Sequence, residues 1–254
     1  MTAQEWKSLW KREEDGVSAG RDFSHLEGRC VSEPLPWDYR TKVLDFLKPK
    51  SQLLDMGTGG GEFLLSLRHP GALTSVTESW APNLSLCRKR LSPLGIRVEE
   101  CSCGVGVRMP FADDSFDLIL NRHESYDLRE VRRILKNGGY FITQQVGGRD
   151  NELLSKRLIS QYEPELPAFN LENELPRFQA EGFRVMYQNQ DYPVGRFLDV
   201  GALCWYAKRI PWQFPGFSVE RCFDRLLLLQ QELEQRGELT TRGHRFILIG
   251  KNRK

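Results

Sequence analysis

A glycine-rich turn is the part of this sequence whose residue types point most directly to ligand binding. The segment LLDMGTGGGEF spans residues 53–63 and places Gly57, Gly59 and Gly61 directly after a short apolar run. Glycine has no Cβ, so such a turn can bend sharply and let a ligand approach the backbone closely. A G-x-G-x-G turn alone is weak evidence for one ligand, because dinucleotide-binding proteins also have glycine-rich turns.

Two carboxylates beside this turn narrow the choice of ligand. The dinucleotide pattern G-x-G-x-x-G requires glycine at position 62, where this sequence has Glu62. Asp55 comes just before the turn, and a carboxylate there suits an ammonium group but not a pyrophosphate. S-adenosylmethionine carries an amino group and no phosphate. The turn therefore favours this cofactor, and a nicotinamide oxidoreductase is the less favoured alternative.

A third carboxylate stands at the end of the next predicted strand. Glu78 closes the segment LTSVTES, and in this position it can accept hydrogen bonds from both hydroxyls of a ribose. The alternative is a charge exposed at the end of a strand. Trp80 follows two residues later, and its ring either lies on the adenine face or packs against the protein. We interpret Glu78 as the ribose ligand and leave both roles of Trp80 open.

The segment NRHES, residues 121–125, supplies the candidates for group transfer. It follows the predicted strand 116–120, and the carboxyl ends of such strands face the ligand crevice. We therefore expect Asn121, Arg122, His123 and Glu124 near the transferred group. His123 is able to deprotonate a hydroxyl or an amine. In the alternative interpretation, His123 and Glu124 only hold the loop or cap the helix that follows.

Strands and helices must alternate for these residues to meet at one edge of a sheet, and the sequence shows such an alternation from residue 51 onward. Strands are predicted at residues 52–57, 73–79, 96–100, 116–120 and 140–146, and helices at 60–68, 82–91 and 127–139. The last of these helices has Arg132, Arg133 and Lys136 at its negative end and Gly138 as a left-handed cap. This alternation predicts a parallel sheet with right-handed crossovers.

The pattern changes in the second half of the chain. Helices are predicted at 151–162 and 171–180, and strands at 182–190 and 244–250. About fifty residues separate the last two strands, which is too long for a simple loop. They contain the apolar segments 197–207 and 218–235, so we predict a small helical lobe inserted between the strands. Aromatic and polar side chains of this lobe are candidates for lining an acceptor pocket, namely Tyr192, Arg196, Trp205, Tyr206 and Trp212.

The first 40 residues are predicted to be a helix followed by a loop-rich segment. Trp6, Leu9 and Trp10 share one helical face, which either docks on the core or forms a lid over the site. The predicted organisation is therefore an N-terminal helix and lid-like segment at 1–40, a cofactor-binding core at 41–190, a helical insert or cap at 191–243, and a last core strand at 244–254.

The order of these motifs resembles the class I S-adenosylmethionine-dependent methyltransferases. The resemblance covers about residues 50–147 and rests on LLDMGTGGGEF, VTES, RMPFADDSFDLIL and EVRRILKNGGYFITQQV. It is closest to the ubiquinone/menaquinone-methylase-like branch, the methyltransferase type 11-like proteins. It implies an α/β, Rossmann-like fold with a mainly parallel seven-stranded sheet, a late antiparallel strand and a small helical insert. It also implies S-adenosylmethionine as cofactor and S-adenosylhomocysteine as product. By resemblance, the residues that line the cofactor are Asp55, Gly57, Gly59, Gly61 and Glu78.

The sequence departs from the family pattern in one place. Family members often have an acidic residue before the MPF-type segment, where it meets the adenine amino group. The corresponding stretch here, CSCGVGVRMPF, has no carboxylate between Glu100 and Asp113. We expect the backbone around Cys103 to Val105, with Gly104 and Val105, to recognise adenine instead; the alternative is weak binding. The Cys101-x-Cys103 pair has no further ligands at metal spacing, so we predict a structural role and no metal site.

Composition limits the other function classes. The chain has 254 residues, with 36 Lys plus Arg and 34 Asp plus Glu, so its net charge is only +2. A nucleic-acid-binding protein usually carries a basic surplus, so a small-molecule acceptor is favoured over an RNA (guanine-type) base. The sequence has no apolar run of membrane-spanning length, no signal segment and no disulfide framework, so we expect a soluble cytoplasmic protein.

We therefore expect an enzyme that transfers a methyl group by direct displacement, with no sequence signal for the oligomeric state. The amino-methylase loop (N/D)-P-P-(Y/F) and the Pro-Cys dipeptide of cytosine-C5 methylases are both absent. The missing adenine-side carboxylate keeps one further alternative open, a binding protein of the same fold that has lost catalysis.

Overall fold

The structure is a computed structural model that describes residues 1–16 and 23–254, so part of the predicted N-terminal segment, residues 17–22, lies outside it. The chain divides into two compact units, each built from three separate stretches of sequence. The sheet unit comprises Pro36–Val146, Phe169–Gln190 and Phe246–Lys254. The accessory unit comprises Met1–Leu35, Gly147–Ala168 and Asp191–Arg245.

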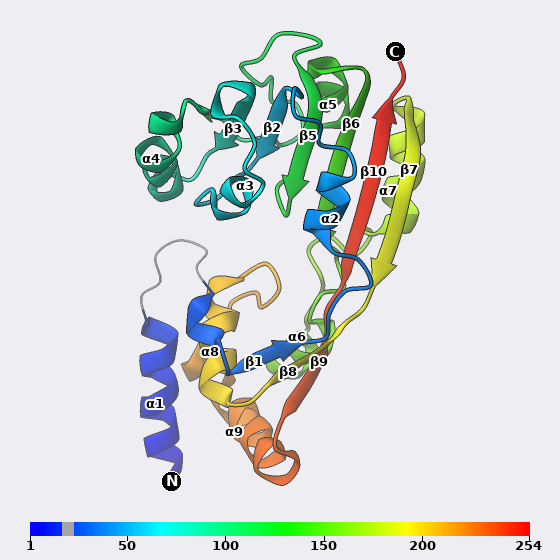
Figure 1. Cartoon of the computed structure of the whole chain (residues 1–254). Coiled ribbons are helices and arrows are strands. Elements are labelled where there is room, and N and C mark those ends of the chain that lie inside the picture. Colours follow the sequence, from blue (N-terminus) through cyan, green and yellow to red (C-terminus); the bar gives the residue numbers. More distant parts are fainter. Residues whose placement is uncertain (17–22) are drawn as a thin grey trace. The chain divides into compact units, whose positions relative to one another are not determined.

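The sheet unit contains the predicted seven-stranded sheet (Figure 1). Its strands are β2 (Leu53–Met56), β3 (Thr74–Glu78), β4 (Arg97–Glu100), β5 (Phe116–Arg122), β6 (Leu135–Val146), β7 (Phe183–Asp191) and β10 (Arg245–Asn252), in the order β4-β3-β2-β5-β6-β10-β7. Each neighbouring pair from β4 to β6 is parallel. Figure 1 shows β10 running opposite to β5 and β7. The expected late antiparallel strand is therefore confirmed.

Besides its strands, the sheet unit contains helices, and three of them begin at a side chain that caps the helix N-terminus. The helices are α2 (Tyr39–Leu44), α3 (Glu62–Ser66), α4 (Ala81–Arg90), α5 (Leu128–Ile134) and α7 (Leu171–Ala180), with short 3-10 turns at Gly71–Leu73 and Ser92–Leu94. The Asp38, Asp127 and Asn170 side chains accept backbone N–H bonds at the starts of α2, α5 and α7. Apolar residues of α5, of α7 and of the strands β2, β5, β6, β7 and β10 form a buried cluster that includes Phe141 and Phe178.

The helix predicted at 127–139 is shorter than expected. It ends at Ile134, and Leu135 already belongs to β6, where it pairs with Phe116. Lys136 forms an ion pair with Asp117 at 2.9 Å, so it does not serve the negative end of a helix. Gly138 does have the positive φ that we predicted, 79°, but inside the strand and not as a helix cap. Burial of Leu135 against β5 outweighs the helix propensity of this segment.

The accessory unit combines helices with a small antiparallel sheet. Its elements are α1 (Ala3–Asp15), a 3-10 turn (Ser24–Leu26), β1 (Cys30–Ser32), α6 (Glu152–Leu158), β8 (Val194–Phe197), α8 (Val200–Arg209), α9 (Val219–Arg236) and β9 (Leu239–Arg242). β8 lies between β1 and β9 and pairs with both. No described helix has an apolar stretch long enough to cross a membrane.

The unit boundaries differ from the predicted ones. Both apolar segments of the predicted lobe form helices, α8 and α9. However, the unit also includes residues 1–35, predicted as a lid-like segment, and 147–168, predicted as part of the core. The reason is that β8 takes one of its partners from the N-terminal segment and that α6 contributes Leu154 and Leu158 to the shared apolar cluster. Strands of three or four residues carry too weak a sequence pattern to predict this arrangement.

Helix α1 is held by both its N-terminus and its apolar face. Thr2 and Glu5 form a capping box, with the Glu5 N–H donating to Thr2 Oγ1 at 3.3 Å. Trp10 is fully buried in the apolar cluster of the accessory unit, and Trp6 stacks on it with ring centroids 5.5 Å apart. Leu9 packs against the same cluster. The predicted apolar face therefore docks on the core of its own unit.

We predict that Trp10→Ala lowers the free energy of unfolding by about 3–5 kcal/mol, because it leaves a cavity where the buried indole packs. Leu228→Ala, at an exposed position of α9, is the matched control and should change stability by less than about 0.5 kcal/mol. Urea denaturation of both variants measures the difference. Equal losses would contradict the docking of α1.

Candidate active site

The glycine-rich turn connects β2 to α3 at the carboxyl edge of the sheet. Gly57, Gly59 and Gly61 all have positive φ values, 64°, 63° and 81°. Two of them are also tightly packed: a Cβ at Gly57 would lie 2.7 Å from Cβ of Glu124, and one at Gly61 would lie 2.9 Å from Cδ2 of Leu91. Glycine is thus required here both by backbone conformation and by space.

Asp55 lies in β2 with only 5% of its surface exposed. Its Oδ2 accepts a hydrogen bond from the Thr58 hydroxyl at 2.7 Å. Burial raises the pKa of Asp55 to about 6, and the nearby Glu78 carboxylate acts in the same direction. The Thr58 hydrogen bond and the Arg122 guanidinium oppose this shift of the pKa. A cation placed beside Asp55 would stabilise its ionised form.

Glu78 is the last residue of β3 and is 6% exposed. Its Oε2 accepts the Gly59 N–H at 3.0 Å, and its Oε1 accepts the N–H groups of Ser79 and Trp80, each at 2.9 Å. A longer contact of 3.4 Å comes from the Asn83 amide. The carboxylate therefore connects the glycine-rich turn to the start of α4.

Two further segments lie near this edge of the sheet. Trp80 precedes α4 and keeps 46% of its surface exposed, so it is not a core residue. Gly104 and Val105 belong to the segment without a carboxylate, and Val105 is largely exposed. Cys103 is buried beside Thr77, with Sγ 3.2 Å from Oγ1, and burial raises the pKa of this thiol to about 12.

The Thr77 and Cys87 side chains form hydrogen bonds to the backbone of the glycine-rich turn. Neither residue was predicted from the sequence to have this role. The Gly57 N–H donates to Thr77 Oγ1 at 3.2 Å, and the Cys87 thiol donates to the Gly59 carbonyl at 2.9 Å. Because Thr77 also contacts Cys103, one threonine links the turn to segment 103–105. The only hint in the sequence is that Thr77, a small polar residue, directly precedes Glu78.

Near the end of β5, the Asn121 side chain is fully buried in a hydrogen-bond network. Its Oδ1 accepts hydrogen bonds from the Thr143 hydroxyl at 3.1 Å and the Gln145 amide at 2.5 Å, and its Nδ2 donates to the Ser125 carbonyl at 3.4 Å. This side chain therefore holds the loop 121–125 in place. Contact of Asn121 with the cofactor stays a prediction.

The same loop brings Glu124 to the glycine-rich turn. The Glu124 side chain lies against Gly57, and its Oε1 accepts the N–H and hydroxyl groups of Ser125 at 3.1 and 2.9 Å. His123 is exposed and has a positive φ of 66°, and its backbone N–H donates to the Gln144 carbonyl at 2.9 Å. The residue before Glu124 thus has a left-handed backbone conformation, which is uncommon for a residue other than glycine.

Comparison with known proteins identifies the family. Residues 54–143 match the family described as "Methyltransferase domain". This segment includes the glycine-rich turn, Glu78 and the loop 121–125. This part of the chain is a methyltransferase domain of the class I S-adenosylmethionine-dependent kind. S-adenosylmethionine is the cofactor of this family, and the expected cofactor and fold class are confirmed.

A curated relative supports the same family. The phthiotriol/phenolphthiotriol dimycocerosates methyltransferase of Mycobacterium tuberculosis is 34% identical over 90 residues, which is 33% of this chain and 32% of the relative. A protein of the same description from Mycobacterium bovis matches equally. The chain thus spans about a third of the length of the curated relatives it matches.

Solved structures show the same fold at low sequence identity. A candidate methyltransferase from Bacillus halodurans has a TM-score of 0.56 at 16% identity, covering 85% of this chain and 99% of its own. The YcgJ protein of Bacillus subtilis has a TM-score of 0.55 at 17% identity, covering 85% and 98%. The [4+2]-cyclase SpnF has a TM-score of 0.51 at 16% identity, covering 99% and 95%. The fold alone therefore does not determine the reaction.

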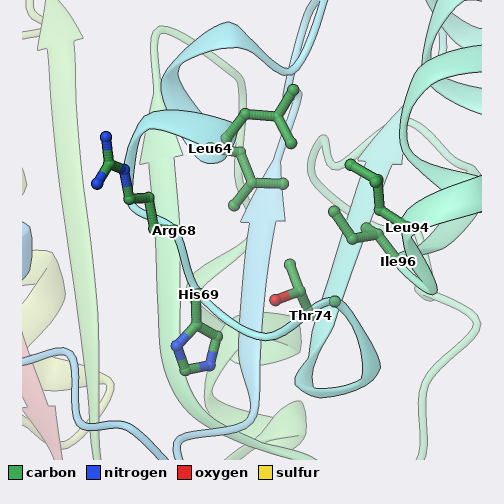
Figure 2. Close-up of a pocket in the computed structure, with 8 residues that line it drawn as sticks. Leu64, Arg68, His69, Thr74, Leu94 and Ile96 are labelled. Atoms are coloured by element: carbon green, nitrogen blue, oxygen red, sulfur yellow. The ribbon is translucent and has the colours of Figure 1, made fainter.

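A separate hollow of about 230 Å³ lies elsewhere in the sheet unit (Figure 2). It is lined by Leu64, Leu65, Arg68, His69, Gly71, Thr74, Leu94 and Ile96. Thr74 begins β3, and Ile96 directly precedes β4, so the hollow is at the amino edge of the sheet, opposite the glycine-rich turn. It is not part of the candidate active site.

The aromatic residues proposed for an acceptor pocket do not share one environment. Trp205 is buried in the core of the accessory unit, and the Tyr206 hydroxyl accepts a hydrogen bond from the Asn151 amide at 2.8 Å. Tyr192 stacks on His244 with ring centroids 4.5 Å apart. Trp212 is 46% exposed. Trp205 and Tyr206 thus serve packing within this unit.

We predict that Gly57→Ala weakens binding of S-adenosylhomocysteine at least tenfold, because the new methyl group displaces Glu124 and strains the turn. Gly28→Ala is the matched control: its φ of 71° is equally unfavourable for alanine, but no atom lies within 4 Å of the new methyl group. Both variants should lose about 1–2 kcal/mol of stability. Isothermal titration calorimetry should show weaker binding only for Gly57→Ala, and normal affinity of that variant would contradict this geometry.

Proposed function

We propose that this protein transfers the methyl group of S-adenosylmethionine to a small-molecule acceptor by direct displacement. The observation that carries the proposal is the pair of buried carboxylates, Asp55 and Glu78, on either side of a tightly packed glycine-rich turn. The matched methyltransferase domain includes both residues.

The residues present fit the cofactor. Asp55 is a buried carboxylate whose pKa is raised to about 6, so a neighbouring ammonium group would compensate its burial. Glu78 is fixed by three backbone N–H groups, and a ribose hydroxyl binding there would replace its longest contact, the 3.4 Å bond from Asn83. The exposed Trp80 ring and the backbone of Gly104 and Val105 are the groups we assign to adenine.

When bound, S-adenosylmethionine supplies a methyl group activated by a sulfonium. The protein's own contribution is alignment and exclusion of water, for which effective concentrations can be worth about 7–11 kcal/mol. Glu124 lies against Gly57, where its carboxylate can hold or accept a proton from the acceptor. We assign His123, on the same loop, as a second candidate base.

Calorimetric titration with S-adenosylmethionine and S-adenosylhomocysteine tests the cofactor assignment. Glu78→Ala and the isosteric Glu78→Gln should weaken both ligands about 10- to 100-fold, because hydrogen bonds to a charged group are lost. Glu100→Ala is the matched control, since Glu100 is the register partner of Glu78 on β4 but is exposed. Failure of the unsubstituted protein to bind either ligand would refute the proposal.

Turnover is the second part of this test. Release of S-adenosylhomocysteine is measured with a panel of hydroxyl, amino and carbon acceptors, which includes lipid alcohols because the Mycobacterium relative is described as acting on phthiotriols. Glu124→Gln should lower kcat about 10²- to 10⁴-fold if it is the base. Cofactor binding without turnover on any acceptor would support the catalytically silent alternative.

Cofactor affinity should depend on pH through Asp55. Its pKa of about 6 means that the carboxylate is mostly ionised at pH 7 and about one-tenth ionised at pH 5. Binding of the cofactor ammonium should therefore weaken about tenfold as the pH falls from 7 to 5. The other charges that act on Asp55 are Glu78 and Arg122. Calorimetry across this range, with Asp55→Asn as control, should show the slope in the unsubstituted protein and a flat profile in the variant.

A further inference from the structure

Arg122 is an exposed cation held on an aromatic platform beside the glycine-rich turn. It is the last residue of β5, which pairs with β2. Its guanidinium carbon lies 4.7 Å from the ring centre of Phe63 and 6.0 Å from that of Tyr39. Phe63 belongs to α3 directly after the turn, so three elements position this one cation.

The platform itself is rigid. The rings of Tyr39 and Phe63 lie 5.1 Å apart, and the buried Tyr39 hydroxyl donates to the Asn121 carbonyl at 3.4 Å. A guanidinium that lies on aromatic faces keeps its N–H donors directed outward at its edges. Arg122 is therefore oriented without using any of its five hydrogen-bond donors.

Within residues 1–16 and 23–254, no hydrogen bond or ion pair is formed by the Arg122 guanidinium. Several other arginines of the sheet unit form ion pairs with carboxylates; for example, Arg90 pairs with Glu62, and Arg133 pairs with Glu130 and Asp113. The charge of Arg122 lowers the pKa of Asp55, but the two side chains form no hydrogen bond, and the Asp55 carboxylate accepts one from the Thr58 hydroxyl. The N–H donors of the Arg122 guanidinium are thus available to bind another anion.

We propose that Arg122 binds a carboxylate of a ligand in this site. The chemistry is complementary to Asp55: an ammonium group beside Asp55 and a carboxylate on Arg122 together match an α-amino acid zwitterion. The carboxylate comes either from the amino-acid end of the cofactor or from an acidic acceptor. This inference rests on the proposed function, because it concerns a ligand of the same site.

The first experiment compares adenosyl ligands with and without the carboxylate. S-adenosylhomocysteine carries it, whereas decarboxylated S-adenosylmethionine keeps only the amine and methylthioadenosine lacks both. If the cofactor is the source, Arg122→Gln weakens S-adenosylhomocysteine at least tenfold and leaves the other two unchanged. Arg122→Lys should recover part of the loss, since it keeps the charge but not the bidentate geometry. Arg184→Gln, at an exposed position of β7, is the matched control.

The second experiment tests an acidic acceptor. Propionate and its neutral isostere propionamide are titrated into protein saturated with S-adenosylhomocysteine, and the Arg122 Nε–H resonance is followed by NMR. If the acceptor is the source, propionate shifts this resonance in a saturable manner, propionamide does not, and Arg122→Gln leaves S-adenosylhomocysteine affinity unchanged. The resonance is assigned by its loss in Arg122→Lys.

The outcomes separate this inference from the proposed function. Absence of S-adenosylhomocysteine binding by the unsubstituted protein overturns both. Normal binding that is insensitive to Arg122→Gln, together with no propionate-specific shift, overturns only the role of Arg122. Loss of affinity for all three adenosyl ligands in Arg122→Gln also overturns it, because a carboxylate contact cannot affect methylthioadenosine.

Discussion

The Glu78 carboxylate sits at the carboxyl end of β3 and accepts backbone N–H groups from two different loops. A buried carboxylate is costly unless donors surround it, so both loops must keep their positions for the protein to be stable. Glu78 is in place because β3 lies parallel to β2, with Val76 opposite Asp55. The register of two strands thereby determines the shape of the glycine-rich turn and the start of α4.

Neutral side chains hold the backbone at this edge of the sheet, and charged side chains lie around the glycine-rich turn. Thr77, Cys87 and Asn121 bond to backbone or amide partners in the interior. The carboxylates of Asp55, Glu78 and Glu124 lie beside the glycine-rich turn. These three carboxylates surround one turn, and Arg122 is the only cation among the charges that act on Asp55. Such a group of carboxylates suits a cofactor that carries both a sulfonium and an ammonium group. The electrostatics and the family assignment therefore agree.

Much of the sheet could be predicted from sequence because its signals are local. The glycine spacing, the apolar runs and the carboxylates at strand ends each lie within a few residues. The number of strands and the late antiparallel strand follow from the family resemblance. The end of α5 was predicted wrongly, since burial of Leu135 against Phe116 depends on a residue distant in the chain. The accessory unit was divided wrongly for the same reason: β1 joins β8 across more than 150 residues. The contact of Arg122 with Tyr39 and Phe63 could not be predicted either, because no sequence motif connects these three residues.

The position of β10 has a consequence for synthesis of the chain. This strand follows all the other strands of the sheet in the sequence, yet it lies inside the sheet, between β6 and β7. Until it emerges, β6 has an unpaired edge, and β7 has no neighbour in the sheet through which to join it. The nascent chain can thus form the half of the sheet that carries the glycine-rich turn before β10 is made. During that time β6 and β7 keep exposed hydrogen-bonding edges. Cells that make this protein quickly would expose those edges to neighbouring nascent chains, so slow translation or a chaperone would favour its yield.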